Sequence, residues 1–247
     1  MLLTRRALAD RPDLALVAGT RVANVWLLRD GEGRRFLIDS GHRLERSSLE
    51  RGLGAAGVRR GDLTAVLLTH RHSDHAGNAA WLRERYGCPV LCHREEAPVL
   101  AGERPAPRLS GRGAFVAYEA LCRIEDRFPA RCAVDDVFDV GDLGWGFDAI
   151  PVGGHTEGSA LLFHRATATL FTGDALLTGP PAQRFRVRLR LAVPAFSQDA
   201  AACAAETRRF LTDGPPIDTL CGGHGPPVRR GLEGRLRALL EGDGRAA

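Results

Sequence analysis

The sequence predicts a mixed α/β fold, in which two β-sheets are covered by outer helices within one domain spanning residues 1–247. Short apolar runs in the first forty residues are typical of paired strands, and apolar strands alternate with helical patterns later in the chain. An amphipathic pattern near the C-terminus provides a covering helix. The length of 247 residues fits one large domain or two small ones, and the sequence contains no internal repeat and no low-complexity linker.

The N-terminal part is expected to form strands at residues 14–17, 22–28 and 35–38. The turn-forming residues 30–33 separate the last two strands, so these two are expected to pair as a hairpin. Apolar residues then recur at helical spacing until Gly57, which is expected to end a helix because glycine tolerates a left-handed backbone.

Strands and helices alternate in the rest of the chain. A strand at residues 65–68 precedes a helix that Gly87 ends, and Asp199 is expected to be the N-cap of a later helix. A last amphipathic helix places leucines on one face, at positions 232, 236, 239 and 240. Further strands are expected at residues 89–92, 147–152, 161–163, 169–171 and 217–220. Residues 103–131 show no pattern that assigns an element.

The composition excludes several classes of protein. Hydrophobic residues make up 44% and charged residues 26% of the chain, which excludes a disordered or fibrous protein. All 34 basic residues are arginine, so no mechanism that needs a lysine nucleophile or a lysine Schiff base is available. The net charge of +4 is too small for the concentrated basic face of a nucleic-acid-binding protein, and we expect no nucleic-acid partner.

Cysteine usage and hydropathy indicate the compartment. The six cysteines form no CxxC pair, and we expect reduced, buried thiols rather than disulfides. No stretch approaches the ~18 uninterrupted apolar residues of a membrane helix, and the first ten residues do not resemble a secretory signal. We therefore expect a cytoplasmic protein without a membrane partner.

A histidine cluster follows the strand at residues 65–68. His70, His72, Asp74 and His75 lie within six residues, and neutral imidazoles bind zinc, iron or copper while carboxylates bind harder ions. In an extended segment His70 and His72 point to the same side, because side chains alternate with a period of two. The turn into the following helix then directs Asp74 and His75 towards a second ion. The segment predicts a metal site.

Three further residues of the metal-binding type lie beside glycines at the ends of apolar strands. They are His155, Asp174 and His224. Taken singly, each is more typical of a capping or hydrogen-bonding residue than of a ligand. Their order after the histidine cluster makes the metal-binding interpretation the stronger one.

In this combination and order the motifs resemble those of the metallo-β-lactamase superfamily, in which HxHxDH is followed by separate His, Asp and His ligands. The resemblance extends from about residue 24 to residue 228 and implies a four-layer αββα sandwich. It also implies two ions, each with three ligands of its own. The first ion would be held by His70, His72 and His155, the second by Asp74, His75 and His224, and Asp174 would bridge both.

The chemistry expected of such a site is hydrolysis. Two cations roughly 3.5–4 Å apart can share a hydroxide, lower its pKa towards neutrality and polarise a carbonyl or phosphoryl oxygen. We expect two zinc ions, with iron or manganese as the alternatives. Asp74 would be the catalytic residue that takes the proton from the attacking hydroxide. Asp39, in a segment that resembles the family's IDxG turn, would orient a ligand imidazole, or it is simply a turn residue at the end of a strand.

Departures from known branches narrow the interpretation. His72 replaces the Glu of the flavin-dependent di-iron branch, and Asp174 stands where some true β-lactamases have Cys. Ser159 stands at the second histidine of the HTPGH motif of glyoxalase II, and only 23 residues follow His224 (247 − 224). The chain therefore resembles a glyoxalase II-like or lactonase-like core without the glutathione-binding domain.

The leading functional expectation is a metallo-hydrolase that opens an ester-like bond in a small-molecule substrate, such as a lactone or a thioester. One alternative is a phosphodiesterase or ribonuclease, because the same ions can hold a phosphoryl group. A second is a mononuclear iron persulfide dioxygenase, which has a similar motif but uses fewer ligands. A third is a scaffold without catalysis, which the complete ligand set disfavours.

The segment of residues 183–193 alternates apolar residues with arginines, which predicts an extended strand with one apolar and one cationic face. One hypothesis is a lid over the metals, in which Arg186 and Arg188 bind an anionic group of the substrate. The alternative is an edge strand that arginines protect from pairing with other sheets, or the contact surface of a homodimer.

Overall fold

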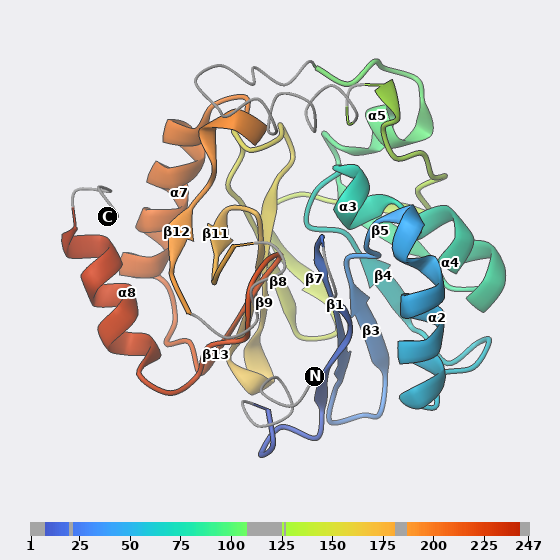
Figure 1. The fold of residues 1–247 in the computed structure, drawn as a ribbon, viewed down its shortest axis with the longest axis horizontal. Coiled ribbons are helices and arrows are strands. Elements are labelled where there is room, and N and C mark those ends of the chain that lie inside the picture. Colours follow the sequence, from blue (N-terminus) through green and yellow to red (C-terminus); the bar gives the residue numbers. More distant parts are fainter. Residues whose placement is uncertain (1–7, 20–21, 108–124, 126, 181–186, 243–247) are drawn as a thin grey trace.

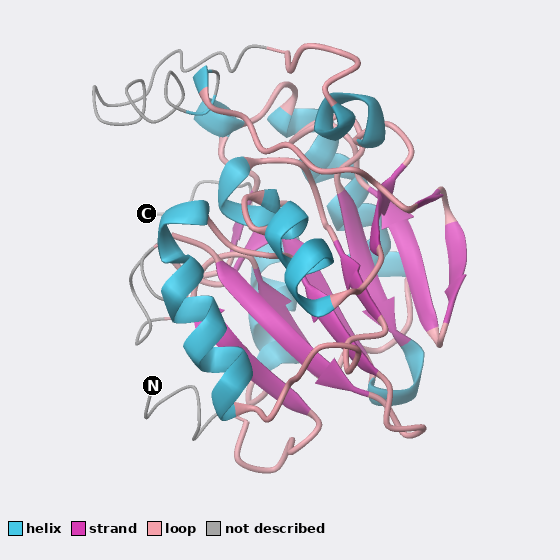
Figure 2. Ribbon diagram, turned by 90° about the vertical axis from the view of Figure 1, so that its right-hand side faces the viewer, coloured by secondary structure: helices cyan, strands magenta, loops and turns pink. Residues whose placement is uncertain are grey.

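Two β-sheets lie face to face in the computed structural model, and helices cover the outer face of each (Figure 1). The structure describes residues 8–242 apart from 20–21, 108–124, 126 and 181–186. In the view turned by 90°, helices lie across the strands (Figure 2). Because each sheet has one face towards the other sheet and one towards helices, its central strands are apolar on both faces.

The first sheet has six strands in the order of the sequence. They are β1 (Leu14–Gly19), β2 (Asn24–Arg29), β3 (Arg35–Ile38), β4 (Ala65–Leu67), β5 (Val90–His93) and β6 (Asp136–Phe138). β1, β2 and β3 are antiparallel, which confirms the expected hairpin, and Trp26 pairs with Ile38. From β3 to β6 the strands are parallel.

The second sheet has five strands in the order β13-β10-β9-β8-β7. They are β7 (Gly141–Gly144), β8 (Phe147–Pro151), β9 (Ala160–His164), β10 (Thr169–Gly173) and β13 (Thr219–Gly222). All neighbours are antiparallel except β10 and β13, which are parallel. A separate pair joins β11 (Leu176–Leu177) to β12 (Arg190–Leu191).

The helices divide between the two outer faces. The first sheet is covered by α2 (Arg46–Ala55) and α4 (Ala79–Tyr86), with α3 (Ser73–Ala76) and α5 (Ala97–Ala101) at one end. The second sheet is covered by α7 (Ala200–Asp213) and α8 (Leu232–Glu241). Short 3-10 turns η1 (Arg43–Glu45), η2 (Arg165–Thr167) and η3 (Pro194–Phe196) lie between elements. None of the helices in the described part of the chain has the length and apolarity that crossing a membrane requires.

The core has three apolar layers. Trp26, Phe36, Phe147 and Phe171 fill the space between the sheets and are at most 2% exposed. One outer layer packs α2 and α4 against the first sheet, and the other packs α7 and α8 against the second. Five of the six cysteines lie in the described part of the chain, and all five are buried and unbridged.

Helix ends follow the sequence closely. Gly87 ends α4 with a left-handed backbone at φ +70°, and the Asp199 side chain accepts a hydrogen bond from the Ala202 amide at the start of α7. The sequence does not predict the strands β6 and β7, because β6 has only three residues and two of the four residues of β7 are glycine. Of the strand expected through residues 183–193, residues 183–186 lie outside the described residues. Within residues 187–193 only Arg190–Leu191 form a strand, because its described partner β11 has two residues and Pro194 follows closely.

The fold brings four chain segments to one edge of the sandwich. The carboxyl ends of β4, β8, β10 and β13 lead into the segments that carry His70, His155, Asp174 and His224, respectively. β10 and β13 are parallel, so their carboxyl ends meet at the same edge of the second sheet. The candidate metal-binding residues are thus adjacent in space, although the first and the last of them are more than 150 positions apart in the sequence.

We predict that α2 depends on a close approach to β1 at Gly52. A Cβ atom at Gly52 would lie 1.8 Å from the Val17 carbonyl oxygen, whereas one at the exposed Gly54 would meet nothing within 4 Å. Gly52→Ala should therefore lower the free energy of unfolding in urea by about 1–3 kcal/mol. Gly54→Ala, the control in the same helix, should raise it by about 0.5–1 kcal/mol. Equal effects of the two variants would contradict the packing.

Candidate metal centre

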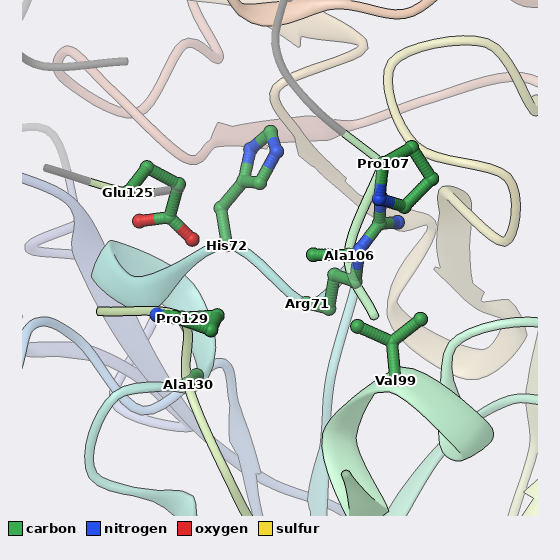
Figure 3. Close-up of a pocket in the computed structure, with 8 residues that line it drawn as sticks. All are labelled: Arg71, His72, Val99, Ala106, Pro107, Glu125, Pro129 and Ala130. Atoms are coloured by element: carbon green, nitrogen blue, oxygen red, sulfur yellow. The ribbon is translucent and has the colours of Figure 1, made fainter. Parts of the chain in front are cut away.

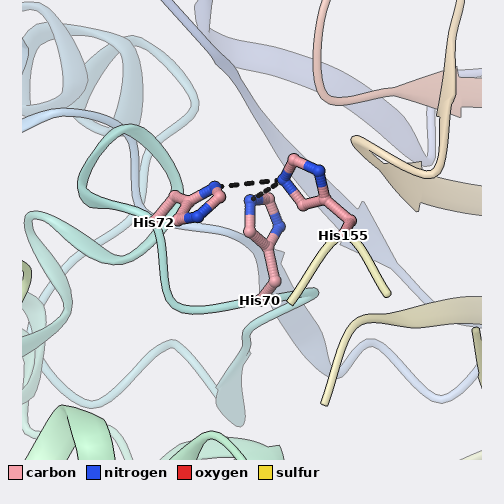
Figure 4. A group of neighbouring side chains, drawn as sticks. All are labelled: His70, His72 and His155. Atoms are coloured by element: carbon pink, nitrogen blue, oxygen red, sulfur yellow. Dashed lines mark hydrogen bonds between the residues drawn. The ribbon is translucent and has the colours of Figure 1, made fainter. Parts of the chain in front are cut away.

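Three imidazoles converge at one side of the site (Figure 4). His155 Nε2 lies 3.2 Å from His70 Nε2 and 3.0 Å from His72 Nδ1. Burial, together with the neighbouring imidazoles, lowers the pKa of His70 and His72 well below the ordinary histidine value. Burial also lowers the pKa of His155 to about 4. All three rings are therefore neutral at pH 7, and each keeps a nitrogen lone pair for a cation.

A second group lies beside the first. Its members are Asp74, His75 and His224. The Nε2 atoms of His75 and His224 lie 3.7 Å and 3.5 Å, respectively, from Asp74 Oδ2. Burial opposes a charge on His75, but the carboxylates of Asp74 and Asp174 outweigh it and raise its pKa well above the ordinary value. Asp74 and Asp174 thus create a negative potential at the position where the sequence predicts a second ion.

Asp174 lies between the two groups and directs one oxygen to each. Its Oδ1 atom lies 3.2 Å from Nε2 of both His75 and His224. Its Oδ2 atom lies 3.9 Å from His155 Nε2. Burial alone would raise the pKa of Asp174, but His224 and His75 lower it well below its usual range. An ionised carboxylate in this position can bridge two cations.

The donor set fits metal ions. His75 Nε2 and Asp174 Oδ1 are buried and have no hydrogen-bond partner among the described residues, although they lie only 3.2 Å apart. Such unsatisfied buried polar atoms are costly in a folded protein. The five imidazoles and two carboxylates supply nitrogen and oxygen donors, which suit zinc, iron or manganese.

Asp39 supports one histidine of each group, His75 by a direct contact and His70 through Thr69. Its Oδ2 atom lies 2.7 Å from His75 Nδ1, so the ring's other nitrogen faces the site. The Thr69 hydroxyl donates to Asp39, and it lies 3.1 Å from His70 Nδ1. Asp39 has φ +60°, an uncommon value for a residue other than glycine. The structure thus places Asp39 both in a strained turn and against the imidazole of His75, which is a candidate metal ligand.

Other supporting residues gave no signal in the sequence. The Ser197 hydroxyl donates to the Val193 carbonyl and lies 3.0 Å from His155 Nδ1, so it accepts from that nitrogen and leaves Nε2 free for a metal. The Asn24 amide donates to the carbonyls of Gly222 and Gly225, on both sides of His224. The Thr178 hydroxyl donates to the carbonyl of His224 itself. Lone Ser, Thr and Asn residues carry no motif, which is why these roles need the structure.

Of the two arginines expected in a lid, only Arg188 is described by the structure, and it is not brought to this site. Arg186 lies outside the described residues. Arg188 is exposed and lines a groove of about 720 Å³ beside α7 and α8, and none of the seven metal-type residues lines that groove. The apolar residues Val187, Leu189 and Leu191 pack against the core layer beneath α7 and α8.

Comparison with known proteins identifies the family. Residues 18–224 match the family model described as the metallo-beta-lactamase superfamily. The probable metallo-hydrolase YybB of Bacillus subtilis is 28% identical over 66% of this chain and 69% of its own length. The hydroxyacylglutathione hydrolase of Pseudomonas paraeruginosa is 32% identical over 76% of this chain, and the match spans 60% of that relative.

A solved structure agrees with these matches. The protein TTHA1623, in a di-iron-bound form, is 27% identical and superimposes with a TM-score of 0.60 over 90% of this chain and 96% of its own. Together with the family match, this confirms the metallo-β-lactamase type of α/β sandwich that the histidine motifs indicated. The family match and the metallo-hydrolase relatives support a hydrolase.

We predict that Asp39→Asn weakens binding at both groups, because Asp39 orients His75 directly and His70 through Thr69. Loss of such an outer partner typically reduces metal affinity about 10–100-fold. Zinc titration of metal-free protein against a competing chelator measures this. Asp135→Asn, which removes an exposed pair with Arg83, is the control and should leave zinc affinity unchanged. Unchanged affinity in Asp39→Asn would show that Asp39 is only a turn residue.

Proposed function

Because this chain belongs to the metallo-beta-lactamase superfamily, we propose that it is a hydrolase that uses two metal ions to cleave an ester-like bond in a small molecule. The observation that carries the proposal is Asp174, whose two oxygens face two different groups of histidines. A mononuclear site needs no such carboxylate between two donor groups. The relative whose structure is named as di-iron-bound supports two ions in this fold.

The residues of this chain divide into two ligand sets. His70, His72 and His155 would hold one ion, and Asp74, His75 and His224 the other, with Asp174 shared. When bound, two such ions lower the pKa of a shared water and polarise the oxygen of the bond to be cleaved. The carbon under attack would lie over the open side of the site, where Asp74 is 22% exposed.

Asp74 is the residue best placed to handle the proton. Its Oδ2 atom faces the second group, and its side chain is the most exposed of the three carboxylates Asp39, Asp74 and Asp174. A carboxylate there can accept the proton that the attacking water loses and return it to the leaving group. This role needs no serine nucleophile, and the chain's lack of lysine is no obstacle.

An ester-like substrate is favoured by the relatives. The name hydroxyacylglutathione hydrolase describes removal of an acyl group from glutathione, a reaction of a thioester. Lactones and thioesters share the electrophilic carbonyl that such a site polarises. We propose zinc as the ion that supports activity, with iron or manganese as the alternatives.

We predict two metal ions per chain. Protein purified without added metal and dialysed should contain, or take up, two equivalents by elemental analysis, because two donor sets share Asp174. Protein reloaded with zinc, iron or manganese should then be assayed with a lactone, a thioester and a phosphodiester. One tightly held iron and no second ion would contradict the proposal, and hydrolysis of only the phosphodiester would overturn the substrate class.

We predict that Asp174→Ala lowers kcat/KM by more than about 100-fold, since loss of a mere outer partner already costs about 10–100-fold. The cause is loss of the only carboxylate that faces both groups among the described residues. Circular dichroism should show that the fold survives. Hydrolysis close to the wild-type rate would show that Asp174 does not bridge.

A further inference from the structure

A buried ionic network lies behind the first histidine group. Arg71, between His70 and His72, is 4% exposed and directs its Nη1 atom to Glu96 Oε2 at 3.1 Å and to Glu157 Oε2 at 2.6 Å. Arg71 and His72 line a pocket of about 10 Å³ beside Val99 and Glu125 (Figure 3). That volume suits about one water molecule. Arg71 and Glu96 are nearly closed to solvent, whereas Glu157 lies at the edge of the network and is 27% exposed.

Glu96 is the centre of this network. It directly precedes α5 and is fully buried. Its Oε1 atom accepts hydrogen bonds from the Thr156 hydroxyl and the Gly158 amide, both at 2.6 Å. One carboxylate therefore joins the loop that carries His70 and His72 to the loop that carries His155.

Glu96 lies close to the backbone of the loop that carries His155. A Cβ atom at Gly158 would lie 2.8 Å from Glu96 Cγ and 2.8 Å from His93 Nδ1. Ser159 closes the same loop, because its hydroxyl accepts from the Thr156 amide at 2.9 Å. The absence of a side chain at position 158 thus allows the carboxylate to reach the backbone.

The contact between Glu96 and Arg71 is a buried ion pair. Glu96 is buried against Arg71, and removal of one partner of a buried pair leaves the other charge uncompensated. Without Glu96, Glu157 would be the remaining ionic partner of Arg71 among the described residues. The less compensated guanidinium beside His72 would then repel a cation held by that ring. Glu157 cannot replace Glu96, because its side chain is 27% exposed and only Glu96 accepts from the Thr156 hydroxyl and the Gly158 amide.

We propose that Glu96 is a positioning residue for the first metal ion. Glu96 would hold the His70–His72 loop and the His155 loop at the separation that His70, His72 and His155 need to bind one ion together. The inference rests on the proposed function, because it presumes that the two histidine groups hold ions. Glu96 contacts neither the ions' ligand atoms nor the open side of the site.

The effect should be selective for one ion. The second group is held by different contacts: His75 by Asp39, and the segment around His224 by Asn24 and Thr178. None of these residues contacts Glu96 in the described part of the structure. Loss of the network should therefore weaken the first ion and leave the second in place.

The test is a zinc titration of metal-free Glu96→Gln protein against a competing chelator, alongside the wild type. Glutamine keeps the size and one acceptor oxygen but loses the charge that pairs with Arg71. We expect the affinity of one of the two zinc equivalents to fall about 10–100-fold, while that of the other stays unchanged. Cobalt substitution gives a spectroscopic check, because only the absorption of the three-histidine site should change.

The matched control is Asp13→Asn. Asp13 pairs at 2.7 Å with the buried Arg11, which bonds Thr169 and Thr219 at the amino ends of β10 and β13, the ends away from the metal ligands. This variant should lower Tm and leave both zinc affinities unchanged. Arg71→Gln removes the link from Glu96 to the His70–His72 loop but keeps the bonds of Glu96 to Thr156 and Gly158. It should give a loss of the same selectivity, and it provides the test if Glu96→Gln does not fold.

The possible outcomes distinguish failure of the proposed two-metal function from failure of the positioning role of Glu96. Wild-type protein that fails to bind two equivalents would overturn the proposed function. Two equivalents in the wild type, with no loss or an equal loss of both in Glu96→Gln, would overturn the positioning role alone. If Glu96→Gln does not fold, no selective loss in Arg71→Gln would overturn it equally.

Discussion

The position of the Asp174 carboxylate between two groups of histidines is the constraint on which the proposed site depends. Five buried imidazoles and two partly buried carboxylates meet at one edge of the sandwich, and two of the atoms that face each other there, His75 Nε2 and Asp174 Oδ1, have no hydrogen-bond partner among the described residues. A cation held between such buried atoms would satisfy both of them. Asp174 has one oxygen towards each histidine group, which is the reason for proposing two cation positions rather than one.

The two-sheet architecture makes this convergence possible. His70 comes from the first sheet, whereas His155, Asp174 and His224 come from the second, and each follows the carboxyl end of a strand. The sheets are held together by the apolar layer around Trp26 and Phe147, away from the donor atoms. Loops on a rigid frame can carry strained turns such as the one at Asp39, because the frame, rather than the loop, supplies the stability.

Much of the fold and the ligand groups could be predicted from the sequence because they carry periodic or clustered signals. The hairpin of β2 and β3, the Gly87 end of α4 and the Asp199 cap of α7 follow from local chemistry. Glu96, Ser197 and Asn24 could not be found this way, because their roles arise from contacts across long stretches of chain. The arginines of residues 183–193 carry a clear periodic pattern, but the pattern does not say which surface they face. In the described part of this segment, Arg188 and Arg190 line a groove beside the outer helices rather than the candidate metal centre.

The most direct test of two ions sharing Asp174 is a crystal structure of zinc-loaded protein with anomalous scattering recorded at the zinc edge. The account predicts two anomalous peaks about 3.5–4 Å apart, one among His70, His72 and His155 and one among Asp74, His75 and His224, with Asp174 between them. A single peak, or two peaks with Asp174 turned away from either, would contradict it.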